Sequence, residues 1–466
     1  MRARQGEMSN RMAGIRRNPP EPLAAVPFSL PSHEVRTLSN GAKLVILPDS
    51  RLPIFSIRIL FPFGDIHDPE NNYGFGSALA SMVMEGTSTR SSRELAERIE
   101  RLGASMGMSC GSDSSIASTA GLSLYFSELL GLLSEIILSP SFPESELNLY
   151  KTNTTEGLRF QRSQAGFLAD ERFAAEIYGQ ASYSRVSPSP EDVEAISREQ
   201  LLRFAEERLL PGDAVILVAG DVDVESAVRE IESRFNGWKG SPSRVDLDLE
   251  VIERISRSTV IVDRKGSAQA NIVLGNIAVP RLHEDFFSLL VLNQVLGAGA
   301  SSRLFMNLRE EKGYTYGAYS KFNMRKFSGD FEVTAEVRTE VTGASVKEFM
   351  YELDRIRSQA VTESELRDAK NYLTGVFPLR AETLDGFVGL LANQYIYGLP
   401  DDYLVTYRER VKSVSAEDVL IAAQKHIRPN QLSMVIVGDA DSVIPQIDDW
   451  SEEVRVYDVD GKERSL

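Results

Sequence analysis

Residues 193–222 read VEAISREQLLRFAEERLLPGDAVILVAGDV, and residues 411–440 read VKSVSAEDVLIAAQKHIRPNQLSMVIVGDA. The two stretches align at a constant offset of 218 without a gap, so that Ser197 meets Ser415 and Gly220 meets Gly438. In the first of them, an amphipathic helical pattern is followed by a short apolar run that is typical of a buried strand. A match of this length predicts that the chain consists of two homologous halves.

The repeat continues upstream of both stretches. Further matches occur in the same order. Glu144–Leu147 matches Glu363–Leu366 at an offset of 219. At an offset of 210, Ser91–Arg93 matches Ser301–Arg303, Gly103 matches Gly313, and Gly107 matches Gly317. Each half mixes helical patterns with strand patterns that alternate as they do in antiparallel sheets. We therefore expect an α+β fold with two homologous lobes, each an antiparallel-rich sheet with helices packed on it, joined by a linker.

Composition sets the boundaries of these parts. The N-terminal segment is rich in Arg and Pro and predicts a disordered arm, whereas the segment after Asn236 has the Gly, Ser and Pro content of a linker. The expected organisation is an arm over residues 1–32, an N-terminal lobe over 33–236, a linker over 237–260, a C-terminal lobe over 261–445 and a polar tail over 446–466.

Charge and residue usage exclude several classes of function. The 51 basic and 67 acidic residues give a net charge of −16, which argues against nucleic-acid binding. A single cysteine, Cys110, excludes an internal disulfide framework. The four histidines are scattered without a pair at ligand spacing, so zinc chemistry of the usual kind is not expected anywhere in the chain. The sequence contains no run of 18 apolar residues, so no membrane span is expected. A cytoplasmic location is expected.

Residues 74–87, GFGSALASMVMEGT, predict one short helix that begins after Gly74 and is stopped by Gly86. Ser77 and Ser81 are four positions apart and therefore share a helix face. A serine in the middle of a helix usually bonds back to the carbonyl one turn earlier, so we do not expect a nucleophile here. His67 lies in the preceding loop, and its spacing pairs it with neither serine.

The glycines and apolar residues around this helix resemble the active-site helix of the pitrilysin/insulinase zinc peptidases, in the branch that includes the mitochondrial processing peptidases. That family carries the inverted zinc motif His-x-x-Glu-His, and Ser77, Ala80 and Ser81 stand in those places. A serine hydroxyl is a poor zinc ligand and alanine is none. At the place of the family's third ligand, a Glu on a later helix, stands Gly157, with Glu156 one position away; which of the two occupies that place stays open.

The second half carries another motif of the resembled family, in residues 301–316. In that family an Arg and a Tyr seven positions further on contact the backbone of the bound peptide, and Arg309 and Tyr316 have this spacing. At the offset of 210, Ile99 and Met106 stand in the first half, so the pair belongs to one lobe only. The alternative is a solvated arginine and a tyrosine that packs on a sheet.

The family also binds peptides as an added strand at a sheet edge. In the first half, the sheet edge that would bind a peptide in this way is expected around Ala104–Gly111, where small side chains would let a peptide backbone approach closely. The same residues are equally typical of a loose loop.

The resemblance implies two lobes that close like a clamshell around a peptide. We expect a chain that is not an enzyme on its own and binds no metal, but is the substrate-binding subunit of a heterodimeric zinc metalloendopeptidase. The partner would be a homologous chain that carries His-x-x-Glu-His and the zinc ion. The alternatives are a structural or scaffold protein of the same fold, and a stand-alone peptide-binding protein acting as a homodimer.

Overall fold

The computed structural model describes residues 29–69, 72–241, 247, 249, 254–447, 449–450 and 454–464. The described helices and strands all lie in the unit Pro31–Leu466. The arm predicted over residues 1–32 lies almost entirely outside the described residues, as does much of the predicted linker 237–260.

Six strands form the first sheet, and in chain order they are β1 (Glu34–Thr37), β2 (Lys43–Pro48), β3 (Ile54–Phe61), β4 (Ser105–Cys110), β5 (Ser115–Leu122) and β6 (Val215–Gly220). Their spatial order is β1-β2-β6-β3-β5-β4. The pair β2–β6 is parallel and the remaining pairs are antiparallel. Asn40-Gly41 between the runs Glu34–Leu38 and Ala42–Leu47 predicts a hairpin. The prediction is confirmed, since Gly41 turns between β1 and β2 with a φ of 92°, which favours glycine.

The helices of the first half are α2 (Phe75–Met82), α3 (Ser92–Arg101), α4 (Phe126–Leu138), α5 (Glu144–Arg162), α6 (Ala165–Tyr178), α7 (Pro190–Ala195), α8 (Arg198–Arg208) and α9 (Val224–Arg234). Apolar side chains from several of them, such as Leu79 and Leu133, join β3 residues such as Ile57 in one buried core. This core holds the first lobe together by removing its apolar faces from water.

Seven strands form the second sheet, and they are β7 (Ser258–Asp263), β8 (Gln269–Ala278), β9 (Thr315–Met324), β10 (Gly329–Arg338), β11 (Ser433–Gly438), β12 (Val454–Tyr457) and β13 (Glu463–Arg464). The order is β13-β12-β7-β11-β8-β10-β9. The helices of this half are α10 (Phe286–Leu296), α11 (Arg303–Phe305), the π-helix η4 (Met306–Glu311), α12 (Thr342–Ser358), α13 (Glu363–Arg380), α14 (Leu384–Tyr397), α15 (Tyr403–Ser413), α16 (Ala416–His426) and α17 (Ala440–Val443).

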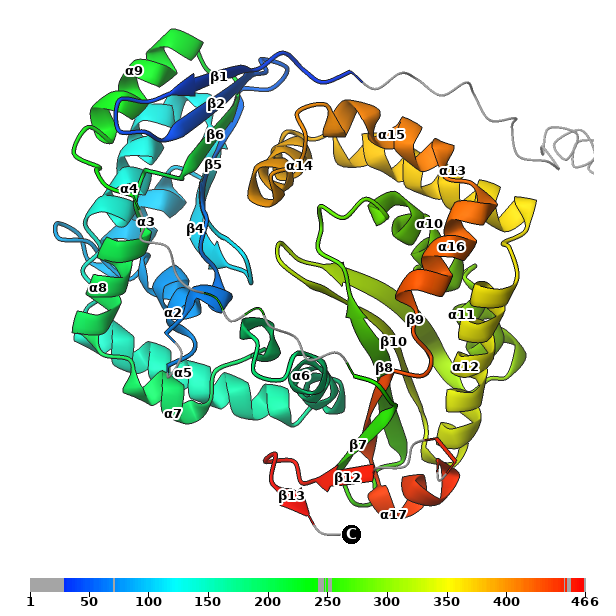
Figure 1. The fold of residues 1–466 in the computed structure, drawn as a ribbon. Helices are drawn as coiled ribbons and strands as arrows, with labels where there is room; N and C mark the ends of the chain where they lie inside the picture. The colour runs from blue at the N-terminus through cyan, green and yellow to red at the C-terminus, as the bar shows by residue number, and fades with distance from the viewer. Residues whose placement is uncertain are drawn as a thin grey trace, which may run out of the picture. The chain divides into compact units, whose positions relative to one another are not determined.

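The two halves share one topology (Figure 1). The order β2-β6-β3-β5-β4 in the first sheet matches β7-β11-β8-β10-β9 in the second. The repeated serines have one structural role, because Ser197 caps α8 and Ser415 caps α16, each by accepting a hydrogen bond from the third residue of its helix. The α+β fold with two homologous lobes, predicted from the repeat, is therefore confirmed.

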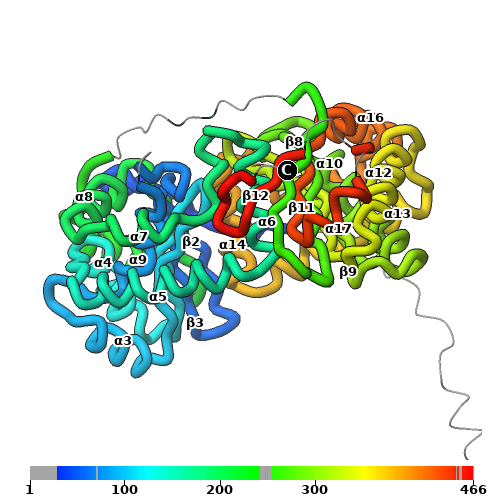
Figure 2. Tube along the Cα trace, turned by 90° about the horizontal axis from the view of Figure 1, so that it is seen from below, coloured from blue at the N-terminus to red at the C-terminus, as the bar shows by residue number. Residues whose placement is uncertain are grey.

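One helix of each half also packs on the sheet of the other half. Helix α6 packs on β8 and β11 of the second sheet, and α14, which lies 219 positions further on, packs on β3 and β6 of the first (Figures 1 and 2). Phe173 of α6 is buried with Val273 and Val435. Tyr178, also on α6, donates a hydrogen bond of 2.9 Å to Asp330 of β10. The lobes are thus joined by buried contacts as well as by the chain.

Three local expectations need correction. Helix α2 ends at Met82 and not at Gly86, because the chain turns away over residues 83–86 before Gly86 adopts a φ of 141°. Strand β7 begins at Ser258, inside the expected linker. The expected tail contains β12, which pairs in parallel with β7 and so extends the second sheet.

Over the described ranges, none of the helices combines the length and the apolar character needed to cross a bilayer. The cytoplasmic location stays a prediction.

Candidate functional site

The hydroxyl groups of the degenerate helix α2 are already engaged. Ser77 Oγ donates to Asp65 Oδ1 at 3.1 Å, and Ser81 Oγ donates to the Ser77 carbonyl at 3.0 Å, one turn earlier, as expected. Ala80 is buried and offers no donor atom. His67 Nδ1 accepts from the Gly64 amide at 3.1 Å, and its burial lowers its pKa to about 4. The described contacts of this helix therefore resemble neither a zinc site nor a serine–histidine pair.

Two carboxylates hold the start of α2, the buried Asp68 and the partly exposed Asp65, and neither was predicted from the sequence because both lie in an apparent loop. The Asp68 carboxylate accepts from the amides of Gly74 and Gly76 at 2.7 and 2.8 Å, as an acidic group at a helix N-terminus should. Asp65 accepts from Ser77 and from Cys110 Sγ. Burial, with a smaller contribution from the charge of Asp65, raises the pKa of Asp68 to about 7.

The place of the family's third ligand lies on α5. Gly157 is exposed, and a Cβ atom added there would contact nothing within 4 Å. The Glu156 carboxylate forms an exposed ion pair with Arg159. A glycine has no donor, and this glutamate has a partner on its own helix. Which of the two corresponds to the third ligand stays open.

The chain before Tyr316 has an irregular backbone. The single turn of α11 continues as the π-helix η4, which carries Arg309. From the sequence, a helix is expected to run through Arg309 and to end at Gly313. This is confirmed, since Gly313 has a φ of 64° and its amide donates to the Arg309 carbonyl at 3.2 Å. Sequence analysis did not predict the π-helix. Single π turns occur frequently at functional sites.

The Arg309 side chain is 46% exposed. Its guanidinium carbon lies 4.7 Å from the centre of the Phe305 ring, and its Nε lies 3.5 Å from Glu310 Oε1. Phe305 in turn packs against Tyr319 of β9, with ring centres 6.1 Å apart. These contacts place Arg309 beside the strand that carries Tyr316.

Tyr316 lies in a β-bulge on an edge strand. β9 is the last strand of its sheet, and its pairing with β10 jumps from Ala318 to Thr315. Thr315 Oγ1 holds the bulge by donating to the Glu336 carbonyl at 2.6 Å and accepting from the Gly317 amide at 3.1 Å. Bulges redirect side chains, and Tyr316 is 88% exposed. A tyrosine that packs on the sheet is therefore not what is found here.

A groove of about 480 Å³ begins at this bulge. β9 contributes Tyr316, Tyr319, Lys321 and three smaller residues to its lining, and β8, β10 and α6 contribute the rest. Among these, Glu332 is buried, its pKa is raised to about 7 by that burial, and the Lys321 ammonium lies 2.6 Å from it. The groove is therefore lined by two tyrosine rings and by the charged side chains of Lys321 and Glu332.

The first sheet also ends in the expected strand. β4 is its last strand and spans the small residues predicted as an edge, so the loose-loop alternative for Ala104–Gly111 is wrong. At Gly107 an added Cβ would meet nothing within 4 Å. The molecule therefore offers two edge strands, β4 and β9, at equivalent places of its two sheets.

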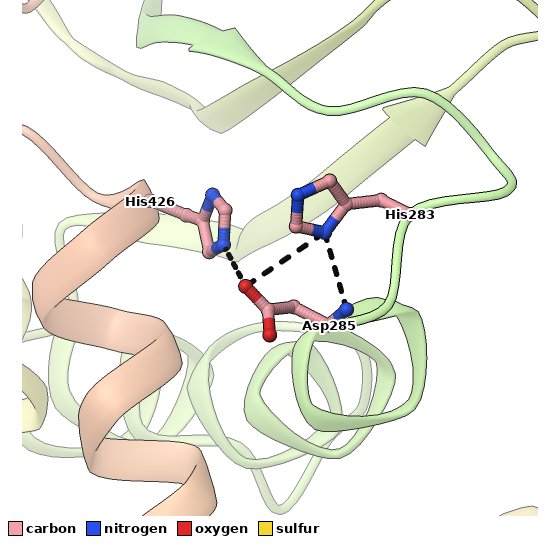
Figure 3. Close-up of side chains that lie close together, drawn as sticks. All are labelled: His283, Asp285 and His426. Atoms are coloured by element: carbon pink, nitrogen blue, oxygen red, sulfur yellow. Dashed lines mark hydrogen bonds and ion pairs between the residues drawn. The ribbon is translucent and has the colours of Figure 1, made fainter.

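A second cluster, which sequence spacing missed, lies in the C-terminal lobe (Figure 3). His283 and Asp285 precede α10, and His426 is the last residue of α16. His426 Nε2 lies 2.6 Å and His283 Nδ1 lies 3.7 Å from Asp285 Oδ2. Burial lowers the pKa of His426. Two of the four histidines thus come together although they are far apart in the sequence.

The chain matches two profiles of one family. The profile described as "Insulinase (Peptidase family M16)" matches residues 44–184, and the profile described as "Peptidase M16 inactive domain" matches residues 195–373. Together they cover more than half of the chain and reach into both lobes.

Curated relatives carry two kinds of name. A Bacillus subtilis protein named "uncharacterized zinc protease YmxG" is 25% identical over 353 residues, which are 74% of this chain and 84% of that protein. A Helicobacter pylori protein named "non-peptidase homolog YmxG" is 23% identical over 411 residues, which are 86% of this chain and 93% of that protein. Both similarities extend over most of each chain.

Solved structures share the fold. A crystal structure described as a peptidase M16 inactive domain from Pseudomonas fluorescens has a TM-score of 0.82 and 25% identity, and covers 88% of this chain and 98% of its own. The crystal structure of a protease from Helicobacter pylori has a TM-score of 0.80 and 20% identity, and covers 88% of this chain and all of its own.

Proposed function

The chain belongs to the insulinase family of peptidases, family M16, as an inactive homologue, and we propose that it is the substrate-binding subunit of a zinc metalloendopeptidase. The catalytic zinc ion would lie on a homologous partner chain that carries His-x-x-Glu-His. The observation that carries the proposal is the exposed Tyr316 in the bulge of edge strand β9, next to the π-helix that bears Arg309.

Peptide binding at β9 would use the main chain first. An edge strand leaves N–H and C=O groups unpaired, and an extended peptide can pair with them as an added strand. The planar Arg309 guanidinium can donate two parallel hydrogen bonds, and the Tyr316 hydroxyl can donate one, to carbonyl groups of that peptide. This chain would therefore bind the peptide and fix its position.

The chemical step would take place on the partner. The His-x-x-Glu-His residues of the partner would hold a zinc ion, which would supply Lewis-acid activation of the scissile carbonyl and of a water molecule. The contribution of this chain is to hold the peptide in line with that site, because correct positioning of the reacting groups lowers the barrier substantially. The Ser77 and Ser81 hydroxyls donate hydrogen bonds within this chain, which agrees with a chemical step on the partner.

The experiment reconstitutes the chain with a homologous His-x-x-Glu-His protein from the same organism and measures cleavage of a fluorogenic peptide. The chain alone should not cleave it. Arg309→Ala should lower kcat/KM of the complex roughly tenfold or more, since a hydrogen bond that involves a charged group contributes about 1.5–3 kcal/mol. Tyr316→Phe should lower it roughly two- to tenfold, since a hydrogen bond between neutral groups contributes about 0.5–1.5 kcal/mol. Matched controls are Arg367→Ala and Tyr351→Phe, which are similarly exposed residues on α13 and α12.

Two results would reject the proposal. Turnover by the isolated chain would show that it has its own catalytic centre. Equal losses in the Arg309→Ala variant and in the Arg367→Ala control would show that the edge of β9 has no special part in binding. Peptide binding by the isolated chain without any activation of a partner would instead support a stand-alone peptide-binding protein.

A further inference from the structure

We propose that His283, Asp285 and His426 form a binding site for a divalent transition metal, zinc above all, in the C-terminal lobe. This site is separate from the degenerate helix α2 and from the groove at β9. It goes beyond the proposed function, because metal binding here requires neither the partner nor a peptide.

The three side chains converge on one point (Figure 3). One ligand atom from each lies within 4.8 Å of the other two. His426 Nε2 and His283 Nδ1 face the same oxygen, Asp285 Oδ2, at 2.6 and 3.7 Å. Ligand atoms around a tetrahedral zinc ion lie about 3.3 Å apart, because the bonds to nitrogen and oxygen are about 2.0–2.2 Å long. The two distances to Asp285 Oδ2 lie on both sides of this value, and the third pair of ligand atoms lies within 4.8 Å, so the side chains would rotate when an ion binds.

The kinds of ligand favour zinc over the common alkaline-earth ions. Two imidazole nitrogens and one carboxylate oxygen suit zinc, copper, nickel and cobalt, whereas magnesium and calcium prefer oxygen ligands alone. Three protein ligands leave a fourth position for water. Water can reach it, because the side chains of His283 and Asp285 are both partly exposed.

The surrounding structure holds both histidines in place. The His283 amide donates to the Pro280 carbonyl at 3.1 Å, and the Phe286 amide donates to the His283 carbonyl at 3.1 Å, so the loop is a closed turn. On the other side, the buried Asn276 side chain donates to the His426 carbonyl at 3.0 Å. Ligands on such fixed backbone are arranged before the metal arrives.

Two existing contacts compete with a metal ion. The Lys425 ammonium lies 2.7 Å from Asp285 Oδ2, and the Asp285 amide donates to His283 Nδ1 at 3.1 Å. Lys425 is 49% exposed, so its ammonium can move into water when a metal ion replaces it. At the offset of 218, the residue that corresponds to His426 is Arg208, which cannot bind a metal. The site is therefore specific to the second half.

The test is isothermal titration of the full-length, EDTA-treated chain with zinc chloride, without partner or peptide. We expect about one zinc ion per chain and a rise in Tm with zinc but not with magnesium, because a ligand of the folded state stabilises it. His283→Ala and His426→Ala should each weaken zinc binding roughly tenfold or more, as loss of a ligand does. His33→Ala, at a partly exposed histidine outside the site, is the matched control.

Lys425→Ala separates a metal site from an ion-pair network. If the cluster binds zinc, removal of the competing ammonium should tighten binding severalfold. Absence of zinc binding to the wild-type chain would overturn the proposal, and so would binding that His283→Ala leaves unchanged. Should the buried His426 prove necessary for folding, the partly exposed His283 still decides the question. Because no peptide is present, failure here leaves the proposed function untouched.

Discussion

Gly317 offers the sharpest test of the groove at β9. A Cβ atom added at this residue would lie 2.6 Å from Tyr319 Oη and 2.7 Å from Tyr319 Cε2, which is too close for either atom. Tyr319 is 47% exposed, so its ring moves more easily than the strand does. Gly317→Ala should therefore push the Tyr319 ring away from its place in the groove wall and away from Phe305.

The expected change in stability is small because two effects oppose each other. Loss of the Phe305–Tyr319 ring contact destabilises the fold by about 0.5–1.5 kcal/mol. Replacement of a glycine by alanine stabilises it by about 0.4–1 kcal/mol through the unfolded chain. The free energy of unfolding should thus change by about 1 kcal/mol or less. Peptide affinity should fall roughly fivefold, which corresponds to about 1 kcal/mol lost from one groove wall.

The first lobe supplies the control. Gly107 is the repeat equivalent of Gly317 at the offset of 210, and a Cβ there meets nothing within 4 Å. Gly107→Ala should bind peptide as the wild type does. Urea unfolding reports stability, and fluorescence anisotropy with a labelled unfolded peptide reports affinity. In a Tyr319→Ala background, Gly317→Ala should have no further effect on peptide affinity, which a double-mutant cycle measures directly.

The reasoning is refuted if Gly317→Ala binds peptide like Gly107→Ala while Tyr319→Ala weakens binding. It is also refuted if Gly317→Ala lowers the free energy of unfolding by more than about 2 kcal/mol, because the strand itself would then have moved.

Three further predictions concern the first lobe and its junction with the second. Burial raises the pKa of Asp68 to about 7, above the 3.8 of an ordinary aspartate, so between these pH values the folded state binds more protons than the unfolded state. Stability to urea should therefore fall as pH rises from 4 to 7, and Asp68→Asn should flatten this profile. Tyr178→Phe removes the hydroxyl that donates to Asp330, and urea unfolding should show a loss of about 1–2 kcal/mol. Ser81→Ala removes only a bond back to the Ser77 carbonyl, so stability should change by less than about 0.5 kcal/mol and cleavage by a reconstituted complex should stay the same.

Local patterns predicted individual elements well. The continuous apolar run over residues 54–61 predicts a buried strand and the alternating pattern over residues 329–338 predicts a half-buried one, and both strands have those bounds in the structure, Ile54–Phe61 and Gly329–Arg338. Alternating or continuous apolar residues define a strand without reference to the rest of the chain, and the repeat then gives the same order of strands in both sheets. The glycine after Arg309 likewise ended its helix as predicted, since a φ of 64° favours glycine at that place.

Long-range arrangement could not be predicted in this way. An amphipathic pattern shows that α6 has an apolar face, but it does not show that this face covers the opposite sheet. β12 is short and lies in a polar segment, and only its parallel pairing with β7 makes it a strand. The approach of His283 to His426 depends on how α10 and α16 pack. In each case the deciding contacts join residues that are far apart in the sequence.

The structure explains how helix α2 keeps its form with Ser77 and Ser81 at the places where the sequence predicts that the zinc ligands are missing. Its buried face, with Leu79 and Met82 fully enclosed, belongs to the core of the first lobe. Ser77 and Ser81 lie on a different, partly exposed face, and Asp68 satisfies the amide groups at its N-terminus. The stability of the helix therefore comes from packing and from its N-terminal cap, and neither depends on the residues that would bind zinc. The bulge at Tyr316 depends on its sheet instead, because the Thr315 hydroxyl that holds it donates to the Glu336 carbonyl of the neighbouring strand β10.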